Sequence, residues 1–577
     1  MLKLVLGASG SGKTTLLYAR IRARAEAGNR SILLVPEQFT SSTEARIYRE
    51  LGDALSGMVE SYSFTSLAEH ILAVEGGAAV QTLTDAGRAV LVRRALEELQ
   101  DNVHYYYRHR RSAAFCQMAA ETIDELKSAG LSGQQLQELA RDCGTESAKL
   151  GELALIFQGY ESLLAGTGMD PADRLELAAD RLEAALARDE LPDFLREREV
   201  FIDEFDTFNA PKKRLMGAML AALPAVTVAL CEDGAPMQPG DLELFSGAKQ
   251  VAAQLRQLAR KNGAQVAAPE LLRRDLRHKD APGLAALTEL LETGSCTPPE
   301  SAPELRLFAA ASREEEARCA AAAIRRLMRQ GVRCGKIAVV CRDISLYRAA
   351  VRYEFRMAEI PLYCDEPTTP EFSAPATAVR ALLALLRGAD MTEQLTVLAK
   401  TGLCALTEPE VCALENYAYT WSPNAAAWRA EFTKSPRGFG DAELTEEDTL
   451  NLTRAENARK KLVTAVDTLR SKVRSANAEQ ISRALYFCLK ELGAEGQQAA
   501  QVEDIRAARG IPAAEEAARE WNVVMQLLDE MARLLGSQGI TVPEYEDLFS
   551  LLLRSSDLGH IPQTLDAVVL ASAGKMR

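Results

Sequence analysis

Short apolar runs and long amphipathic stretches alternate along the 577 residues of the chain. A short run of Val, Ile and Leu that ends at turn residues is typical of a buried parallel strand. By this criterion we predict strands at residues 2–6, 31–35, 58–64, 200–202, 226–230, 305–309, 337–340 and 567–570. Ala- and Leu-rich blocks with helical spacing lie between them, as in Val92, Ala95, Leu96 and Leu99.

The order of these elements predicts an α/β fold of two units, each interrupted by a large all-α insertion. The first unit takes in residues 1–66 and 197–235, and its insertion takes in residues 67–196. Residues 236–303 form a linker or helical connection, in which 242–261 is helix-like. The second unit takes in residues 304–373 and 557–577, and its insertion takes in residues 374–556.

Composition narrows the class of protein. With 47% hydrophobic residues, the chain can bury the cores of several domains. A formal charge of −14 argues against capture of nucleic acid by the whole surface but leaves room for a local basic groove. The 11 cysteines include no C-x-x-C pair, and no apolar stretch is long enough to span a bilayer. We therefore expect a reduced, cytoplasmic protein without a zinc knuckle, a disulfide framework or a membrane partner.

The strongest chemical signal follows the first predicted strand, where the pattern G-x-x-x-x-G-K-[ST] occurs as G-A-S-G-S-G-K-T. Glycines permit the positive φ angles that turn backbone N–H groups toward phosphate oxygens, and a helix N-terminus adds a favourable dipole. Lys13 is expected to reach the β- and γ-phosphates of ATP, and Thr14 to hold Mg²⁺. The predicted nucleotide-binding residues are Gly7, Ala8, Ser9, Gly10, Ser11, Gly12, Lys13, Thr14 and Thr15.

An acidic pair after the fourth predicted strand supplies the second half of such a site. Asp203 is expected to bind Mg²⁺ through water, and Glu204 to polarise the water that attacks the γ-phosphate. Lys13 and Asp203 are 190 residues apart, which disfavours a compact nucleoside kinase or a small GTPase. Two further candidates are Arg342, which would stabilise the γ-phosphate from the second unit, and Gln38, which would contact the nucleotide or anchor a turn.

Two motif-like segments have simpler explanations. Residues 131–135, L-S-G-Q-Q, approximate the signature of ABC ATPases but fit a capping box in which Ser132 and Gln135 start a helix. Residues 125–127 supply the E-x-K of a metal-dependent nuclease, yet they belong to a helical pattern, whereas that chemistry normally draws its carboxylates from strands. We interpret the first segment as a cap and the second as part of a solvated helix.

Residues 104–111, H-Y-Y-Y-R-H-R-R, combine aromatic rings with cations. Rings can stack on bases while arginines neutralise phosphates, as proteins that bind single strands require. The alternative is the edge of an amphipathic helix, with half-buried tyrosines and solvated arginines. The sequence favours the helix edge and leaves the nucleic-acid interpretation open.

Five further motifs follow the loop at residues 7–14 along the chain. They are V-P-E-Q-F-T at 35–40, S-F-T-S-L-A at 63–68, I-D-E-F at 202–205, I-P-L-Y-C-D-E at 360–366 and L-D-A-V-V-L at 565–570. In this order they resemble the AddB subunit of bacterial AddAB-type helicase–nucleases. The resemblance covers the whole chain but only the N-terminal, helicase-like part of the family.

The resemblance implies a superfamily-1-like helicase core, in which two RecA-like P-loop NTPase units flank ATP and Mg²⁺. Members of the family pair with an AddA-type subunit that supplies the motor. The heterodimer acts on double- and single-stranded DNA and resects double-strand breaks for recombinational repair, and the AddB side is associated with recognition of the Chi sequence. The family's C-terminal nuclease domain and iron–sulfur cluster have no counterpart in these residues, so we expect a truncated product without its own nuclease site.

Two other functions stay open. A non-hydrolysing scaffold would bind nucleotide for stability and contribute only DNA recognition and partner contacts. An unrelated P-loop ATPase would make the later motifs coincidences. Glu204 favours hydrolysis, whereas the family's use of AddA as the motor favours the scaffold.

Overall fold

The short apolar runs of the N-terminal part form one parallel sheet. The computed structural model of the chain describes residues 1–77, 82–99, 101–110, 112–236, 244–364, 369–440, 443–537, 539–556, 558 and 566–574. Six strands pair in parallel in the order β3-β2-β4-β5-β1-β6. These strands are β1 (Leu2–Gly7), β2 (Ser31–Leu34), β3 (Val59–Tyr62), β4 (Glu199–Ile202), β5 (Ala225–Cys231) and β6 (Glu270–Leu272).

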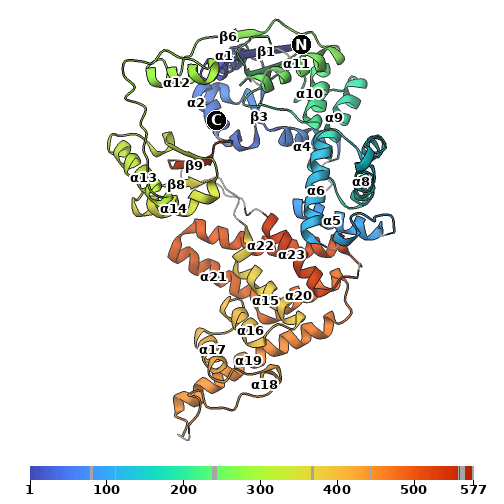
Figure 1. Cartoon of the computed structure of the whole chain (residues 1–577), viewed down its shortest axis with the longest axis vertical. Coiled ribbons are helices and arrows are strands. Elements are labelled where there is room, and N and C mark those ends of the chain that lie inside the picture. Colours follow the sequence, from blue (N-terminus) through green and yellow to red (C-terminus); the bar gives the residue numbers. More distant parts are fainter. Residues whose placement is uncertain are drawn as a thin grey trace.

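Helices cover both faces of this sheet, which explains why its central strands are apolar without alternation. Successive side chains of a strand point to opposite faces, so Leu4 and Leu6 enter one core and Val5 enters another. The first core is completed by α4 (Phe64–Glu75), α9 (Pro171–Ala187), α10 (Ala210–Ala222) and α11 (Ser246–Lys261). The second is completed by α1 (Lys13–Glu26), α2 (Thr40–Leu51) and α3 (Asp53–Ser56). This unit lies at the top of Figure 1.

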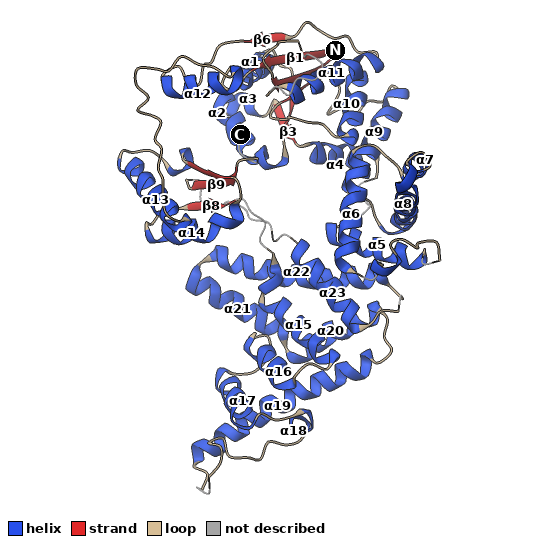
Figure 2. Ribbon diagram, viewed as in Figure 1, coloured by secondary structure: helices blue, strands red, loops and turns tan. Residues whose placement is uncertain are grey.

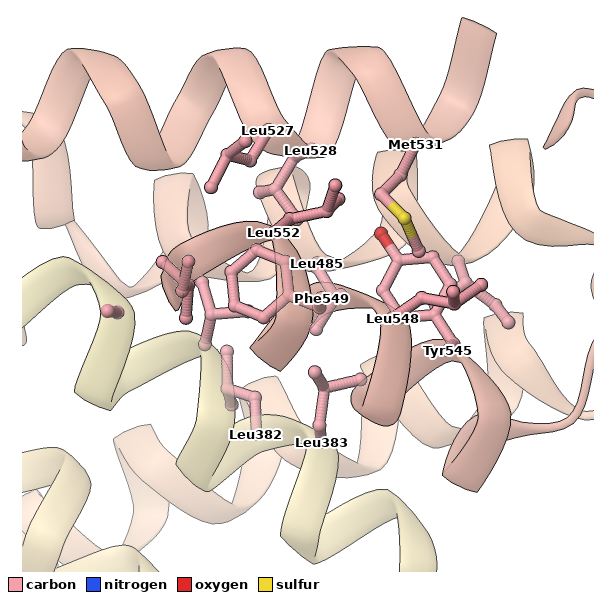
Figure 3. Close-up of a cluster of buried hydrophobic side chains, with 14 of the residues drawn as sticks. Leu382, Leu383, Leu485, Leu527, Leu528, Met531, Tyr545, Leu548, Phe549 and Leu552 are labelled. Carbon is pink, nitrogen blue, oxygen red and sulfur yellow. The ribbon is translucent and has the colours of Figure 1, made fainter. Parts of the chain in front are cut away.

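The two all-α insertions share one hydrophobic core. Val90 and Phe157 of the first insertion belong to the same cluster as Leu382, Leu527 and Phe549 of the second, the last three of which are drawn in Figure 3. The first insertion supplies α5 (Asp85–Glu98), α6 (Ala113–Ser128), α7 (Gly133–Ala140) and α8 (Ser147–Thr167). The second supplies α15 (Ala374–Arg387), α16 (Met391–Lys400), α17 (Glu408–Trp421), α18 (Ala425–Arg429), α19 (Glu446–Val473), α20 (Ala478–Leu492), α21 (Ala494–Arg509), α22 (Ile511–Leu535) and α23 (Val542–Ser555).

Polar contacts also join the two insertions. Thr84, which caps the N-terminus of α5, donates its hydroxyl to Glu530 of α22 at 2.8 Å. Arg93 of α5, only 2% exposed, forms an ion pair of 3.4 Å with Glu544 of α23. Two blocks that are far apart in the sequence are therefore one helical body, which occupies the lower half of Figure 1 and part of its right side.

A second, smaller sheet lies apart from the first, as the red strands of Figure 2 show. Its parallel order is β7-β9-β8, with β7 (Ala338–Cys341), β8 (Leu362–Cys364) and β9 (Val568–Ser572). The helices α13 (Arg313–Arg329) and α14 (Ile344–Met357) share its core, and α12 (Pro282–Thr293) lies on the connection between the sheets. Short 3-10 turns are η1 (Glu37–Phe39), η2 (Tyr107–His109), η3 (Gly144–Glu146), η4 (Cys334–Lys336) and η5 (Pro370–Phe372).

Seven of the eight predicted strands are confirmed, with ends that shift by one or two residues. The strand predicted at 305–309 is wrong. This segment pairs with no strand of either sheet described above, and Leu307 and Phe308 are 99% and 67% exposed. The strands β6 and β8 escaped prediction because each has only three residues. Within the motif segments, residues 365, 366 and 565 lie outside the described residues, as do 557, 559–565 and 575–577 of the predicted second unit.

Of the interpretations of the motif-like segments, the capping box is confirmed, and the other two are wrong at least in part. Ser132 and Gln135 form the predicted capping box at the start of α7. Residues 125–127 lie on a helix, but Lys127 is not solvated, because its amine is buried between Asp170 at 2.7 Å and Asp173 at 2.8 Å. The segment 104–110 is not the edge of a regular helix but a loop that contains η2, and residue 111 lies outside the described residues.

Among the described residues, no helix is both long and apolar enough to cross a membrane.

Candidate nucleotide-binding site

The loop between β1 and α1 has the backbone geometry that its glycines predict. Gly10 and Gly12 have φ angles of 80° and 90°, in the left-handed region that favours glycine. Gly12 also forms the N-cap of α1, and no side chain caps this helix end. The first N–H groups of α1 therefore remain available to an anion, and the helix dipole favours negative charge there.

Lys13 is the first residue of α1 and folds back over the loop. Its Nζ donates to the carbonyl oxygens of Gly7 at 2.7 Å and Ala8 at 2.8 Å. Burial lowers the pKa of Lys13, while Cys231 and Asp203 nearby act in the opposite direction. The ammonium thus lies within the loop, where it can exchange carbonyl partners for phosphate oxygens.

Asp203 lies directly after β4 and faces Thr14. The backbone N–H of Glu204 donates to Oδ1 of this carboxylate at 3.0 Å. Asp203 is 6% exposed, and burial raises its pKa, while the neighbouring Thr14 side chain acts to lower this pKa. A hydroxyl and a carboxylate are hard oxygen ligands of the kind that Mg²⁺ takes together with water and phosphate, so this pair fits a magnesium ion.

Glu204 occupies an unusual backbone conformation. Its φ angle is 67°, in the left-handed region that residues with a side chain rarely adopt. The turn directs Glu204 into the same pocket as Lys13 and Asp203. A left-handed residue other than glycine beside a cluster of charges is a common feature of functional sites.

A pocket of about 720 Å³ opens over the loop, which is within the range of small-molecule and nucleotide sites. Three basic and three acidic residues line it. The cations are Lys13, Arg46 and Arg277, and the carboxylates are those of Asp203, Glu204 and Asp206. The remaining lining residues are Ser9, Gly10, Gly12, Thr14, Thr15, Phe205, Ala229, Cys231 and Leu276.

Arg277 and Arg46 were not predicted from the sequence. Arg277 belongs to the segment after β6, which lies against the loop: the N–H of Leu276 donates to the carbonyl of Gly10 at 3.0 Å, and Arg277 donates to the hydroxyl of Ser9 at 3.4 Å. Asp275 fixes this segment by accepting from the N–H groups of Arg277 and His278. Arg46 of α2 lies 4.8 Å from the centre of the Tyr18 ring.

One sequence signal could have located Arg277. Residues 273–279, R-R-D-L-R-H-K, form a dense basic run within the predicted connection, and such runs can mark anion sites. Arg46 gives no such signal, since it stands among ordinary charged residues of an exposed helix face.

The other predicted site residues are distributed as follows. Gly7, Ala8 and Ser11 belong to the loop without lining the pocket, and Ser11 has a buried hydroxyl that contacts no hydrogen-bond partner in the described structure. Arg342 follows β7, is exposed, and is not among the residues that line the pocket. The side chain of Gln38 lies outside the described part of the structure. No group of three or more His, Cys, Asp or Glu side chains placed to hold a metal occurs within the described ranges.

The fold and the site define an α/β protein with a phosphate-loop motif at the carboxyl edge of a six-stranded parallel sheet. Comparison with known proteins then shows which family the chain resembles. Residues 4–288 match the family described as "ADDB, N-terminal". The chain is thus similar to the AddB family, and the similarity to individual members extends over its whole length.

Three relatives, each named as one subunit of an "ATP-dependent helicase/deoxyribonuclease", illustrate the extent of the similarity. The protein of Moorella thermoacetica is 30% identical over 600 residues, which cover 100% of this chain and 51% of the relative. Those of Desulforudis audaxviator and Symbiobacterium thermophilum are 29% and 28% identical, again over 100% of this chain and 51% of each relative. The chain therefore spans about half the length of the relatives it matches.

Proposed function

We propose that the chain is an ATP-binding, DNA-binding, helicase-like part of an AddB-type subunit, and that it hydrolyses ATP at the loop of residues 7–15. One observation carries the nucleotide part of this proposal. Lys13, Thr14 and Asp203 meet in one pocket, although Asp203 lies 190 residues from Lys13 in the sequence. A lysine, a hydroxyl and a buried carboxylate in this arrangement suit a nucleoside triphosphate with its Mg²⁺.

The strand order supports a RecA-like first unit. The loop follows β1 and the acidic pair follows β4, with β5 between them, so both loops open at the same carboxyl edge. We propose that the smaller sheet with α13 and α14 belongs to the second RecA-like unit.

The residues of the pocket take the following roles in the proposed hydrolysis. Lys13 neutralises charge on the β- and γ-phosphates, and Glu204 orients and polarises the attacking water. Thr14 and Asp203 would hold Mg²⁺, which when bound neutralises phosphate charge. Arg277 adds a second cation from the same unit, so charge stabilisation of the γ-phosphate does not depend on Arg342.

The names of the relatives suggest the wider context. They are called subunits of an ATP-dependent helicase/deoxyribonuclease, and we propose that this chain likewise works with an AddA-type partner on double- and single-stranded DNA. The proposed task is resection of double-strand breaks for recombinational repair in the bacterial cytoplasm, on the side of the heterodimer that recognises Chi. An iron–sulfur cluster is proposed only for full-length members of the family and not from the residues of this chain.

Titration of labelled ATP tests the nucleotide site. Lys13→Ala should abolish ATP binding and leave the fold intact, since Nζ of Lys13 donates to carbonyl oxygens of its own loop. Lys261→Ala, at the exposed end of α11, is the matched control. Equal ATP affinities for the Lys13 variant and the unmodified chain would refute the site.

Release of phosphate with and without DNA separates the alternatives. Strong stimulation by DNA supports a DNA-dependent ATPase. DNA binding without turnover supports the non-hydrolysing scaffold, for which the separate motor subunit of the family is the main argument. Turnover without any effect of DNA supports an unrelated ATPase.

A further inference from the structure

The loop between α5 and α6 carries a compact group of aromatic rings. Tyr105 and Tyr106 pack edge to face with ring centres 4.9 Å apart, and Tyr106 continues to Phe115 of α6 at 5.2 Å. His109 also packs on Phe115, at 5.9 Å. The helices α5, α6 and α8, which hold this loop, lie together at the right of Figure 1. We name the loop, residues 101–110, the tyrosine loop.

A single carboxylate fixes the backbone of the tyrosine loop. Glu152 of α8 accepts from three successive N–H groups, those of His104 at 2.8 Å, Tyr105 at 2.7 Å and Tyr106 at 3.1 Å. Hydrogen bonds to an ionised acceptor are stronger than neutral ones. These bonds hold the backbone of the loop, and with it the rings, in place before any ligand arrives.

The fixed rings remain accessible to a ligand. Tyr105 and Tyr107 are 58% and 44% exposed, and Met118 of α6 beside them is 56% exposed. A pocket of about 750 Å³ opens here, lined by Tyr105, Tyr106 and Phe115 together with cationic groups. Exposed tyrosines beside a hollow of this size offer faces on which planar groups can stack.

Cations surround the rings. Arg110 lies with its guanidinium 3.7 Å from the centre of the Tyr107 ring, and Arg108 and Lys149 line the pocket. Lys149 has an exposed carboxylate partner, Glu146, at 3.4 Å. Residues 102–120 contain no Asp or Glu at all, whereas acidic residues are 81 of the 577 in the chain. The chain is acidic overall, yet the segment that carries these rings has no acidic side chain of its own.

From this geometry we propose that the tyrosine loop binds single-stranded DNA, with bases stacked on Tyr105 and Tyr107 and phosphates paired with Arg108 and Arg110. Stacking on aromatic faces requires unpaired bases, which a duplex keeps inside its helix, so the surface suits a single strand. The proposal deepens the DNA-binding role proposed above and rests on it, but it does not involve the ATP pocket.

Fluorescence anisotropy with a labelled oligothymidylate of about 20 nucleotides tests the stacking part on the full chain. The double variant Tyr105→Ala/Tyr107→Ala should bind at least about fivefold more weakly, since one base stacked on an aromatic side chain contributes that much or more. Both side chains are exposed, so their loss leaves no cavity in the core. Tyr419→Ala on α17, where the tyrosine is 89% exposed, is the matched control.

The salt dependence of binding tests the phosphate part. Arg108→Ala should make the slope of log K against log salt shallower by about 0.7, the value for one phosphate contact on a single strand. Arg141→Ala, an exposed arginine after α7, should leave the slope unchanged.

Three results would overturn the inference. The first is unchanged affinity of the double tyrosine variant. The second is a duplex of the same length bound as tightly as the single strand. The third is a full chain that binds ATP but no oligonucleotide; a chain that binds neither would also refute the proposed function.

Discussion

The left-handed backbone conformation of Glu204 predicts that a glycine variant is more stable than an alanine variant at this position. Glu204 has a φ angle of 67°, and a residue with a Cβ is destabilised by about 1–2 kcal/mol in this region. Glycine avoids that strain. Replacing Glu204 with glycine or with alanine removes the same carboxylate, so a comparison of the two variants isolates the backbone.

The expected difference follows from two opposing terms. The glycine variant recovers about 1–2 kcal/mol of strain. It loses about 0.4–1 kcal/mol because glycine makes the unfolded chain more flexible. Glu204→Gly should therefore be more stable than Glu204→Ala by about 1 kcal/mol.

Hydrogen exchange of the strands β1, β4 and β5 is the suitable assay, because it reports the first unit alone. Tryptophan fluorescence would not report it, since Trp421, Trp428 and Trp521 all lie in the second insertion. A difference of about 1 kcal/mol corresponds to exchange that is about fivefold slower in the glycine variant. Both variants should keep ATP binding and lose phosphate release, if Glu204 polarises the attacking water.

Glu197 supplies a matched control. It is a glutamate with a φ angle of 58°, located just before β4, and it does not line the pocket. Its glycine and alanine variants should show the same order of stability and leave phosphate release unchanged. If Glu204→Gly exchanged as fast as Glu204→Ala or faster, the turn would hold no strain and this reasoning would be refuted.

Three further predictions concern other parts of the molecule. Lys127→Met should destabilise the helices around it by about 3–5 kcal/mol, seen by calorimetry, because it leaves Asp170, 1% exposed, without its cation. Arg277→Ala should weaken ATP affinity about 10- to 100-fold in the same titration as above, as the loss of a charged hydrogen bond predicts. Burial raises the pKa of Glu520 to about 7 from 4.5, so the folded chain binds this proton more tightly and stability should fall as pH rises from about 4.5 through 7. Glu520→Gln should flatten that dependence in unfolding followed through Trp521.

Local sequence patterns were sufficient for much of the fold. The apolar run before the glycine-rich loop forms β1, and the run before Asp203 forms β4, because strands buried on both faces need unbroken apolar sequence. The same criterion failed at residues 305–309, where an apolar run has no partner strand among the described residues, and at β6, where three residues are too few to form a run. Strand pairing is a long-range property, so a run of residues alone does not decide it.

The packing of the two insertions against each other was not predicted for a similar reason, because it depends on contacts between distant residues. Both are apolar along helical stripes, and the stripes show that each must pack against something. They do not show the partner, which is the other insertion for α5, α6, α7 and α8, whereas α4 and α9 pack against the sheet. The contacts of Thr84 with Glu530 and of Arg93 with Glu544 join residues that no local pattern relates.

The residues of the candidate site also fall into two groups. A local sequence pattern marks some of them, and only the pairing of strands brings in the others. Lys13 and Thr14 were predictable because the loop that holds them is one continuous segment, and Asp203 because a strand end marks it. Arg277 stands 264 residues after Lys13, and it reaches the loop only because β6 pairs with β1 and carries the following residues to the same carboxyl edge. A parallel sheet collects the ends of all its strands at one edge, so the chemistry of the site depends on the order of the strands in space. A site of this kind can be predicted from sequence only as far as each of its segments carries its own motif.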